Sequence, residues 1–278
     1  MNIQIVKSCT DSILFPYMNL RERTLRGEKI FIAEGDLVVE RLLDSRYETE
    51  SVLVSDRAKD RIFPMLERKL PTSVPIYVVP FEEVEGLVGF PFHQGVMAVG
   101  RRKDLWTLND LAPIGDAAKQ RSKLRRGIVV LPDITKPDNV GVVFRNAAAL
   151  GADGVLLGPQ ACDPLSRRGL RVSMGGVLQL PWILTDDLNR DLEILRQKFH
   201  YTVYGTILSS NAMDLRDVSW ESRLAICLGN EYDGLKPDTL AHCDVCVTIP
   251  MACGVDSLNL GVSSGIFLYS ALHGRGET

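Results

Sequence analysis

The chain has 278 residues, of which 45% are hydrophobic and 24% charged, and its formal net charge is −3. This is ordinary globular composition, and the negative balance argues against a protein that coats nucleic acid non-specifically. No run of about 18 consecutive apolar residues occurs, so the sequence predicts no membrane-spanning helix, and we expect a soluble, cytoplasmic protein.

The six cysteines are too sparse for a disulfide scaffold. Cys243 and Cys246, preceded by His242, have the spacing of half a metal site. A zinc site needs a full set of ligands, and no second Cys-x-x-Cys or His-x-x-x-His is present. We therefore expect no metal.

The first hundred residues predict a small α/β unit, because short apolar runs alternate with stretches of helical spacing. Strands are expected at 31–35, 51–55, 74–79 and 97–99, and helices at 37–43 and 62–70. Residues 101–126 then change character, since charged residues dominate and Pro113 and Gly115 interrupt the few apolar positions. We interpret 101–126 as a linker between a domain at 1–100 and a second domain at 127–278.

From residue 127 the pattern is strongly α/β. Strands are expected at 128–131, 155–157, 202–204, 224–228 and 245–249. These runs are continuously apolar and most are separated by helical stretches, which indicates a parallel sheet buried on both faces.

The first segment with chemical potential follows the strand at 128–131. A polar loop leads into a helix expected at 140–150, with Asp138 or Asn139 as its cap. Free backbone N–H groups at a helix start favour an anion, and Arg145 could reach the same place. On these residues alone, a capped surface helix with one exposed arginine remains equally open.

Two further segments follow later strands. Gly229, Asn230 and Glu231 lie at a strand exit, where open α/β sheets place their ligands, although a simple turn with a solvated carboxylate also fits. The third segment runs from Ile249-Pro250-Met251 to Ser257-Leu258-Asn259 and leads into an apolar final helix. Proline and methionine there suit an apolar wall, and the polar residues suit a helix cap.

Taken together, the three segments resemble the TrmH/SpoU family of RNA methyltransferases. The family pattern Asn-x-Gly-x-x-x-Arg-Asn-Ala is matched from Asn139 to Ala147, the pattern Gly-x-Glu followed by a glycine from Gly229 to Gly234, and the Ile-Pro-Met to Ser-Leu-Asn pattern from Ile249 to Asn259. Tyr232 and Asp233 depart from the small or acidic residues of the second pattern, a difference that could tune substrate choice. More loosely, Glu34-Gly35 with His93-Gln94-Gly95 resembles the L30e-like RNA-binding domain of this family.

The resemblance implies an α/β fold in which a parallel-sheet SPOUT domain with a C-terminal deep trefoil knot follows a smaller L30e-like domain. It implies a homodimer that transfers a methyl group from S-adenosylmethionine to a ribose 2'-hydroxyl of tRNA or rRNA. The residues it assigns to catalysis are Arg145, Asn139, Glu231, Ser257 and Asn259, and those it assigns to the cofactor are Thr206, Leu208, Gly229, Asn230, Ile249, Met251 and Leu258.

In this scheme Arg145 binds the target phosphate and lowers the pKa of the ribose hydroxyl. A guanidinium keeps its proton at any ordinary pH, so the group that removes the hydroxyl proton is left open.

Positive charge is clustered along the chain, which suggests a localised track for RNA in spite of the net charge. The residues we expect to contact RNA are Arg21, Arg23, Arg26, Arg167 and Arg168.

Two other classes of protein compete with this interpretation. A nicotinamide-dependent dehydrogenase is disfavoured, because no Gly-x-Gly-x-x-Gly follows any expected strand. A non-catalytic RNA-binding module with the same fold remains the alternative, although such a module would be expected to lose the arginine or asparagine of the first pattern.

Overall fold

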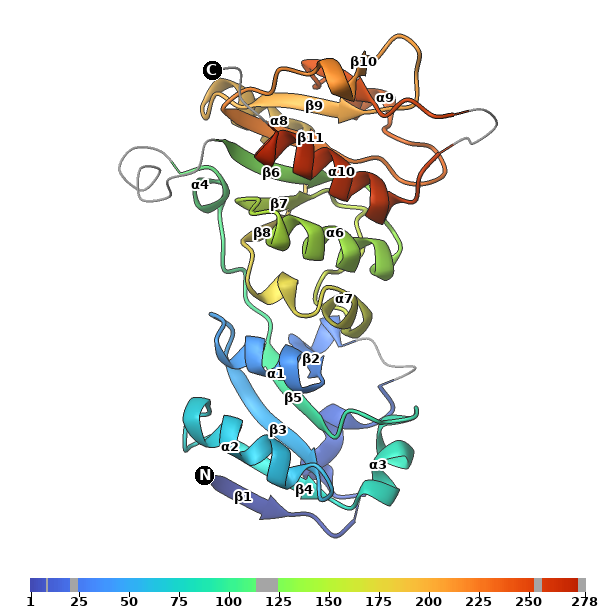
Figure 1. Ribbon diagram of the computed structural model, residues 1–278. Helices are drawn as coiled ribbons and strands as arrows, with labels where there is room; N and C mark the ends of the chain where they lie inside the picture. The colour runs from blue at the N-terminus through green and yellow to red at the C-terminus, as the bar shows by residue number, and fades with distance from the viewer. Residues whose placement is uncertain (9, 21–24, 114–124, 253–256, 275–278) are drawn as a thin grey trace. The chain divides into compact units, whose positions relative to one another are not determined.

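The structure is a computed structural model that describes residues 1–278 except 9, 21–24, 114–124, 253–256 and 275–278 (Figure 1). The chain divides into two compact units. Unit 1 comprises Met1–Asp104 and Leu165–Gln179, and unit 2 comprises Leu105–Pro164 and Leu180–Thr278. The sequence did not indicate that residues 165–179 belong to unit 1. The domain division expected from sequence stays a prediction.

Unit 1 is built on a five-stranded mixed sheet of order β1-β4-β3-β5-β2. Its strands are β1 (Asn2–Ile5), β2 (Ile30–Glu34), β3 (Thr49–Ser55), β4 (Pro75–Val79) and β5 (Val96–Arg101). β5 runs antiparallel to both β2 and β3, whereas β4 is parallel to β3 and β1. Every residue of β2 is buried, which explains why an apolar run without alternation forms this strand.

Helices α1 (Asp36–Leu43), α2 (Lys59–Lys69) and α3 (Phe81–Val88) connect these strands. Shorter helical turns in unit 1 are η1 (Ser12–Tyr17), η2 (Arg26–Glu28), α7 (Arg167–Val172) and η3 (Gly176–Leu178). The Tyr17 side chain is fully buried, and its hydroxyl is 2.8 Å from the Ser51 hydroxyl, so the largest polar group in this core has a partner.

Unit 2 contains a seven-stranded sheet of order β10-β12-β9-β11-β6-β7-β8, in which every neighbouring pair is parallel. The strands are β6 (Arg126–Leu131), β7 (Gly154–Leu157), β8 (Trp182–Leu184), β9 (Thr202–Thr206), β10 (Met213–Asp214), β11 (Arg223–Cys227) and β12 (Val245–Thr248). The predicted α/β class with a parallel-sheet domain is confirmed, whereas the trefoil knot and the L30e-like character of the N-terminal part stay predictions.

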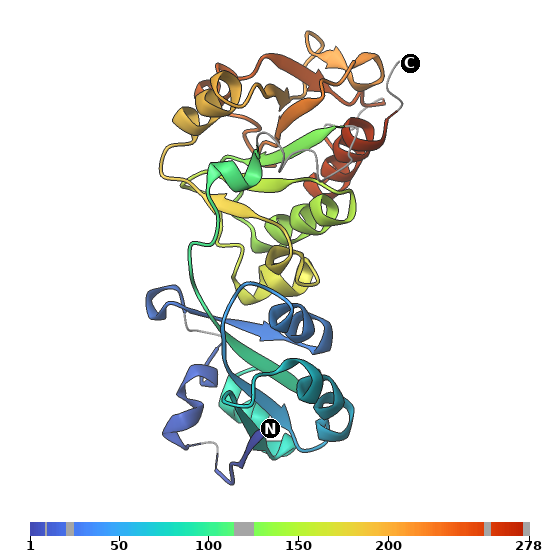
Figure 2. The ribbon, with the colours of Figure 1, turned by 90° about the vertical axis from the view of Figure 1, so that its left-hand side faces the viewer.

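Helices cover both faces of this sheet. Figure 2 shows α6 (Pro137–Ala149) and α10 (Leu260–His273) on one side and α8 (Leu188–Gln197) on the other. Side chains alternate along β6: Ile128 and Val130 share a core with α8, while a side chain on Gly127 would meet Leu272 of α10. The remaining helical pieces are α4 (Leu108–Leu111), η4 (Leu215–Asp217) and α9 (Pro237–Leu240).

The expected linker contributes to the core of unit 2. Leu111 and Ala112 are fully buried and pack with α8 residues, and a side chain on Gly154 would lie 2.7 Å from Leu111. Although 101–126 is rich in charged residues, Leu111 and Ala112 attach this segment to the core of unit 2.

Every strand expected from the sequence is present, and the elements that the sequence did not indicate include β1, β8, β10, α3, α4 and α7. The prediction that Asp138 or Asn139 caps the helix of the first segment is wrong. That helix begins at Pro137, with Lys136 as its N-cap residue and no side-chain capping bond. Proline has no N–H to satisfy and its φ suits the first helical position, so the helix starts earlier than the apolar spacing indicates.

Candidate functional site

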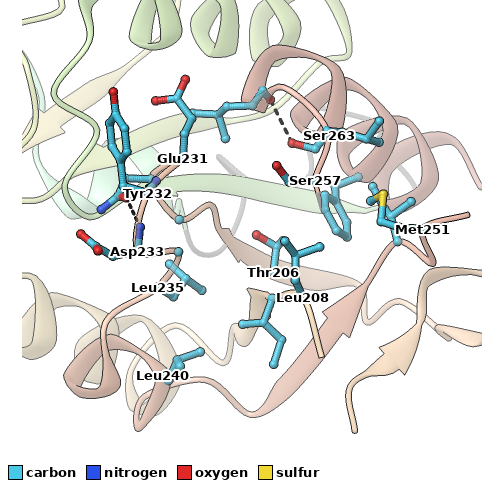
Figure 3. A pocket seen from close by; sticks show the side chains of 18 residues that line it. Thr206, Leu208, Glu231, Tyr232, Asp233, Leu235, Leu240, Met251, Ser257 and Ser263 are labelled. Carbon is cyan, nitrogen blue, oxygen red and sulfur yellow. Dashed lines mark hydrogen bonds between the residues drawn. The ribbon is translucent and has the colours of Figure 1, made fainter. Parts of the chain in front are cut away.

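A pocket of about 510 Å³ opens at the carboxyl ends of β9, β11 and β12 in unit 2 (Figure 3). Its lining comes from the segments after these strands and from the start of α10. The residues that line it are Thr206, Ile207, Leu208, Gly229, Asn230, Glu231, Tyr232, Asp233, Gly234, Leu235, Leu240, Ile249, Met251, Ser257, Leu258, Leu260, Ser263 and Phe267. All seven residues expected to bind the cofactor are among them.

The loop after β11 is a compact turn that only glycine permits at its start. A Cβ on Gly229 would lie 2.4 Å from the carbonyl carbon of Gly234, a distance that real Cβ atoms do not show. Gly234 itself has a φ of 68°, in the left-handed region. The backbones of Asn230 and Gly234 exchange hydrogen bonds of 3.2 and 3.1 Å, which closes the loop.

Asn230 holds this loop in two directions. Its side-chain oxygen accepts hydrogen bonds from the backbone N–H groups of Tyr232 and Asp233, at 2.9 and 2.8 Å. Its side-chain nitrogen donates to Asp133 Oδ2 at 3.0 Å, and Asp133 is the second residue after β6. The wall of the pocket is therefore tied to the neighbouring strand of the sheet.

Asp133 is a functional candidate that sequence reasoning missed. It is 7% exposed, and Lys236 Nζ lies 2.9 Å from Oδ2, so the buried carboxylate has a cation beside it. The hydrogen bond with Asp133 raises the pKa of Lys236. A polar residue shortly after a buried strand was the available signal, because the carboxyl ends of the strands form the ligand edge of a parallel sheet.

Glu231 joins the first and second segments. The side-chain amide of the buried Asn139 donates a hydrogen bond to Glu231, and Lys136 Nζ lies 3.4 Å from the other carboxylate oxygen. A side-chain hydrogen bond with Tyr232 is the main cause that raises the pKa of Lys136, and a second one with Glu231 adds to it. Asn139 therefore contacts Glu231, which lines the pocket, and does not cap its own helix.

The opposite wall is formed at the end of β9 and the start of α10. Thr206 Oγ1 donates to the carbonyl oxygen of Cys227 at 3.0 Å, which joins β9 to β11 beside the pocket. Ser257 and Leu258 line the pocket, whereas Asn259 lies outside the lining and caps α10 by accepting from Gly261 N at 2.8 Å.

Helix α6 packs closely on α10 through small residues. The Asn146 side-chain amide donates to Gly261 O at 2.7 Å and to Ser264 Oγ at 2.9 Å. A Cβ on Gly261 would lie 2.6 Å from Val142, so a larger residue there would push the helices apart. This contact fixes α6 beside the helix start that contributes to the pocket.

Arg145 lies next to Asn146 on the exposed part of α6 and outside the pocket lining. No hydrogen bond or ion pair engages its guanidinium within the part of the chain that the structure describes. Its side chain is thus available to an anion that approaches α6 from solvent.

The arginines expected to bind RNA differ in their surroundings. Arg21 and Arg23 lie outside the described residues, and Arg26 begins η2. Arg167 is half-buried in unit 1, where it pairs with Glu34 at 3.1 Å and lies 3.6 Å over the Phe90 ring. Arg168, on the same helix, is exposed. Arg167 therefore packs and pairs inside unit 1, and Arg168 lies at the surface.

The Cys-x-x-Cys segment packs against β9 of the sheet. A Cβ on Gly205 would meet the Cys243 sulfur at 2.9 Å, and contact with Cys243 together with burial raises the pKa of the Cys227 thiol. Among the described residues, no group of three or more His, Cys, Asp or Glu side chains could hold a metal ion. No helix in those same ranges is long and apolar enough to cross a membrane.

The model of the SpoU rRNA Methylase family matches residues 126–269, which contain all of the pocket lining. A 23S rRNA (guanosine-2'-O-)-methyltransferase, RlmB, from Acinetobacter baylyi is 30% identical over 239 residues, which are 85% of this chain and 94% of that protein.

Solved structures agree on the fold. The crystal structure of an rRNA methyltransferase from Sinorhizobium meliloti superimposes with a TM-score of 0.79 at 23% identity, and 98% of each chain is covered. The SpoU methyltransferase AviRb from Streptomyces viridochromogenes, in complex with AdoMet, gives 0.78 at 20% identity and covers 95% of this chain and 98% of that one.

Proposed function

Because this chain belongs to the SpoU rRNA methylase family, we propose that its unit 2 pocket binds S-adenosylmethionine and that the protein methylates a ribose 2'-hydroxyl of RNA. The observation that carries the proposal is that the loops after three parallel strands meet at one pocket. The loops after β9, β11 and β12, which are far apart in sequence, supply a single lining.

The lining suits a nucleoside with a cationic centre. Leu208, Met251 and Phe267 offer apolar and polarisable surface for a purine ring and a sulfonium, and Gly229 lets the loop after β11 close tightly in the same lining. Glu231 adds a carboxylate at the rim for hydroxyl or amino groups. When bound, the cofactor supplies an electrophilic methyl group.

The protein's own groups have to orient and activate the ribose. Arg145 is available on α6 for the phosphate beside the target ribose, and its charge would stabilise the developing alkoxide. Asn139 fixes Glu231, and Asn259 fixes the first turn of α10 behind Ser257. Holding the hydroxyl in line with the methyl group would then raise the rate without a metal.

For the finer target, we infer a guanosine of ribosomal RNA. The support is the name of the relative from Acinetobacter baylyi, a guanosine-2'-O-methyltransferase of 23S rRNA, which aligns over 94% of its length. Mapping 2'-O-methyl positions in total RNA from cells with and without the gene tests this directly. Loss of one rRNA guanosine methylation is expected, and loss confined to tRNA would assign the other substrate.

We further propose a homodimer that works in the cytoplasm. The support for the dimer is α10, whose outward positions Val262, Ile266 and Tyr269 are apolar or aromatic and 52%, 38% and 62% exposed. Their spacing places them on one face of the helix, beside α6. Light scattering after gel filtration should give twice the chain mass, and Val262→Asp should shift it to the monomer. A wild-type monomer at micromolar concentration would contradict the dimer.

A further inference from the structure

Tyr232 is an aromatic side chain left in water at the edge of the pocket. It is 77% exposed, although it belongs to the loop that forms one wall. Figure 3 shows Tyr232 beside Glu231 at one end of the pocket, with Met251 at the other. An exposed ring at such a place offers a flat surface to whatever binds next to the cofactor.

The backbone that carries this ring is firmly held. Tyr232 N donates to Asn230 Oδ1 at 2.9 Å, and Asn230 is itself bonded to the buried Asp133. Asn230 and Gly234, which flank Tyr232 in sequence, pair through their backbones and close the loop. A ring on a fixed backbone loses little further freedom when a ligand stacks on it.

Lys136, the residue before α6, contacts the Tyr232 ring. Its ammonium lies 4.7 Å from the centroid of the Tyr232 ring and 3.4 Å from Glu231 Oε2. One face of the ring therefore carries a cation, while the ring's high exposure leaves surface for a second partner. A cation and an open aromatic face side by side match a nucleotide, which presents a phosphate and a flat base.

We propose that Tyr232, braced by Lys136, is the platform on which the base of the target nucleotide stacks while its ribose faces the methyl donor. This inference rests on the proposed function and adds a specificity-determining residue to the same site. Unpaired RNA bases are commonly held by aromatic rings, and a stacked base fixes the position of the sugar attached to it.

The test compares Tyr232→Ala and Tyr232→Phe with the wild-type protein on a synthetic RNA that spans the mapped position. A second RNA is identical but abasic at the target nucleotide, with the 2'-hydroxyl retained. The measured quantities are kcat/KM for methyl transfer to each RNA and the affinity for S-adenosylmethionine by calorimetry.

On the intact RNA, Tyr232→Ala should lower kcat/KM about tenfold or more, the range of one base–aromatic stack, and Tyr232→Phe should stay close to wild type. On the abasic RNA the wild-type protein should already be slow, and Tyr232→Ala should slow it no further, because the partner of the ring is gone. Affinity for S-adenosylmethionine should be the same in all three proteins.

Equal losses on both RNAs, or a loss of cofactor affinity, would overturn the platform, because the ring would then act by supporting the loop. An unchanged kcat/KM in Tyr232→Ala on the intact RNA would also overturn it. A wild-type protein that binds S-adenosylmethionine but methylates no RNA would instead overturn the proposed function, and the platform with it.

Discussion

At the scale of single residues, the site contains side chains that line the pocket and one, Arg145, that lies outside it on α6. Thr206, Met251 and Leu258 lie in the lining, whereas Arg145 lies outside it with its guanidinium open to solvent. This arrangement suits a division in which the pocket holds the methyl donor and Arg145 meets the RNA.

Arg145→Ala should abolish most of the methyl transfer and leave cofactor binding nearly unchanged. Removing one preorganised charge from a developing oxyanion costs about 100- to 1,000-fold in kcat. Transfer assays and calorimetry on the same preparation measure the two quantities. Near-normal turnover in this variant would exclude the role given to Arg145.

Gly229→Ala should weaken binding of S-adenosylmethionine by about fivefold or more. The added Cβ would lie 2.4 Å from Gly234 and 2.6 Å from the Leu235 nitrogen, so the closed loop has to shift at a cost of about 1–3 kcal/mol. Gly86→Ala is the matched control, because no atom lies within 4 Å of a Cβ there. Equal affinities for the two variants would show that the loop is not part of the cofactor site.

At the scale of elements, β6, β7, β9, β11 and β12 of unit 2 were predictable because each contains a continuous apolar run. β8 and β10 are too short to show such a pattern, and β1 exposes all of its residues. The cap of α6 was misjudged because Asn139 is also a good capping residue, and only the fold reveals that its amide reaches Glu231.

The convergence of the three segments could be anticipated from their positions after parallel strands. The ties that hold them could not, since Asn230 to Asp133 and Asn146 to Gly261 join residues about a hundred positions apart. Tyr232 shows the same limit, because its exposure depends on how its loop is held.

The tight contact between α6 and α10 gives opposite predictions for two glycines of one helix. Gly261→Ala should lower the melting temperature, because its Cβ would lie 2.6 Å from Val142 and overpacking costs about 1–3 kcal/mol. Gly265→Ala should keep or raise it, since its nearest neighbour is at 3.5 Å and alanine gains up to about 1 kcal/mol in helix propensity. Thermal denaturation followed by circular dichroism measures both, and a stabilised Gly261→Ala would contradict the close packing.

At the scale of the whole molecule, a net charge of −3 requires that any RNA track be local. RNA affinity should fall steeply with salt, and Arg168→Gln should lower the slope of log affinity against log salt by about one. Arg190→Gln, at another exposed arginine, is the control and should leave that slope unchanged. A flat salt dependence of the wild-type protein would contradict phosphate contacts.

The most direct test of ribose methylation uses two synthetic RNAs that differ only at the 2'-position of the mapped nucleotide. With labelled S-adenosylmethionine, the RNA that carries the hydroxyl should accept one methyl group, and nuclease digestion should recover it as a 2'-O-methyl nucleoside. The 2'-deoxy RNA should accept none. Equal labelling of both RNAs would place the methyl group on a base and contradict the assignment of the ribose hydroxyl as acceptor.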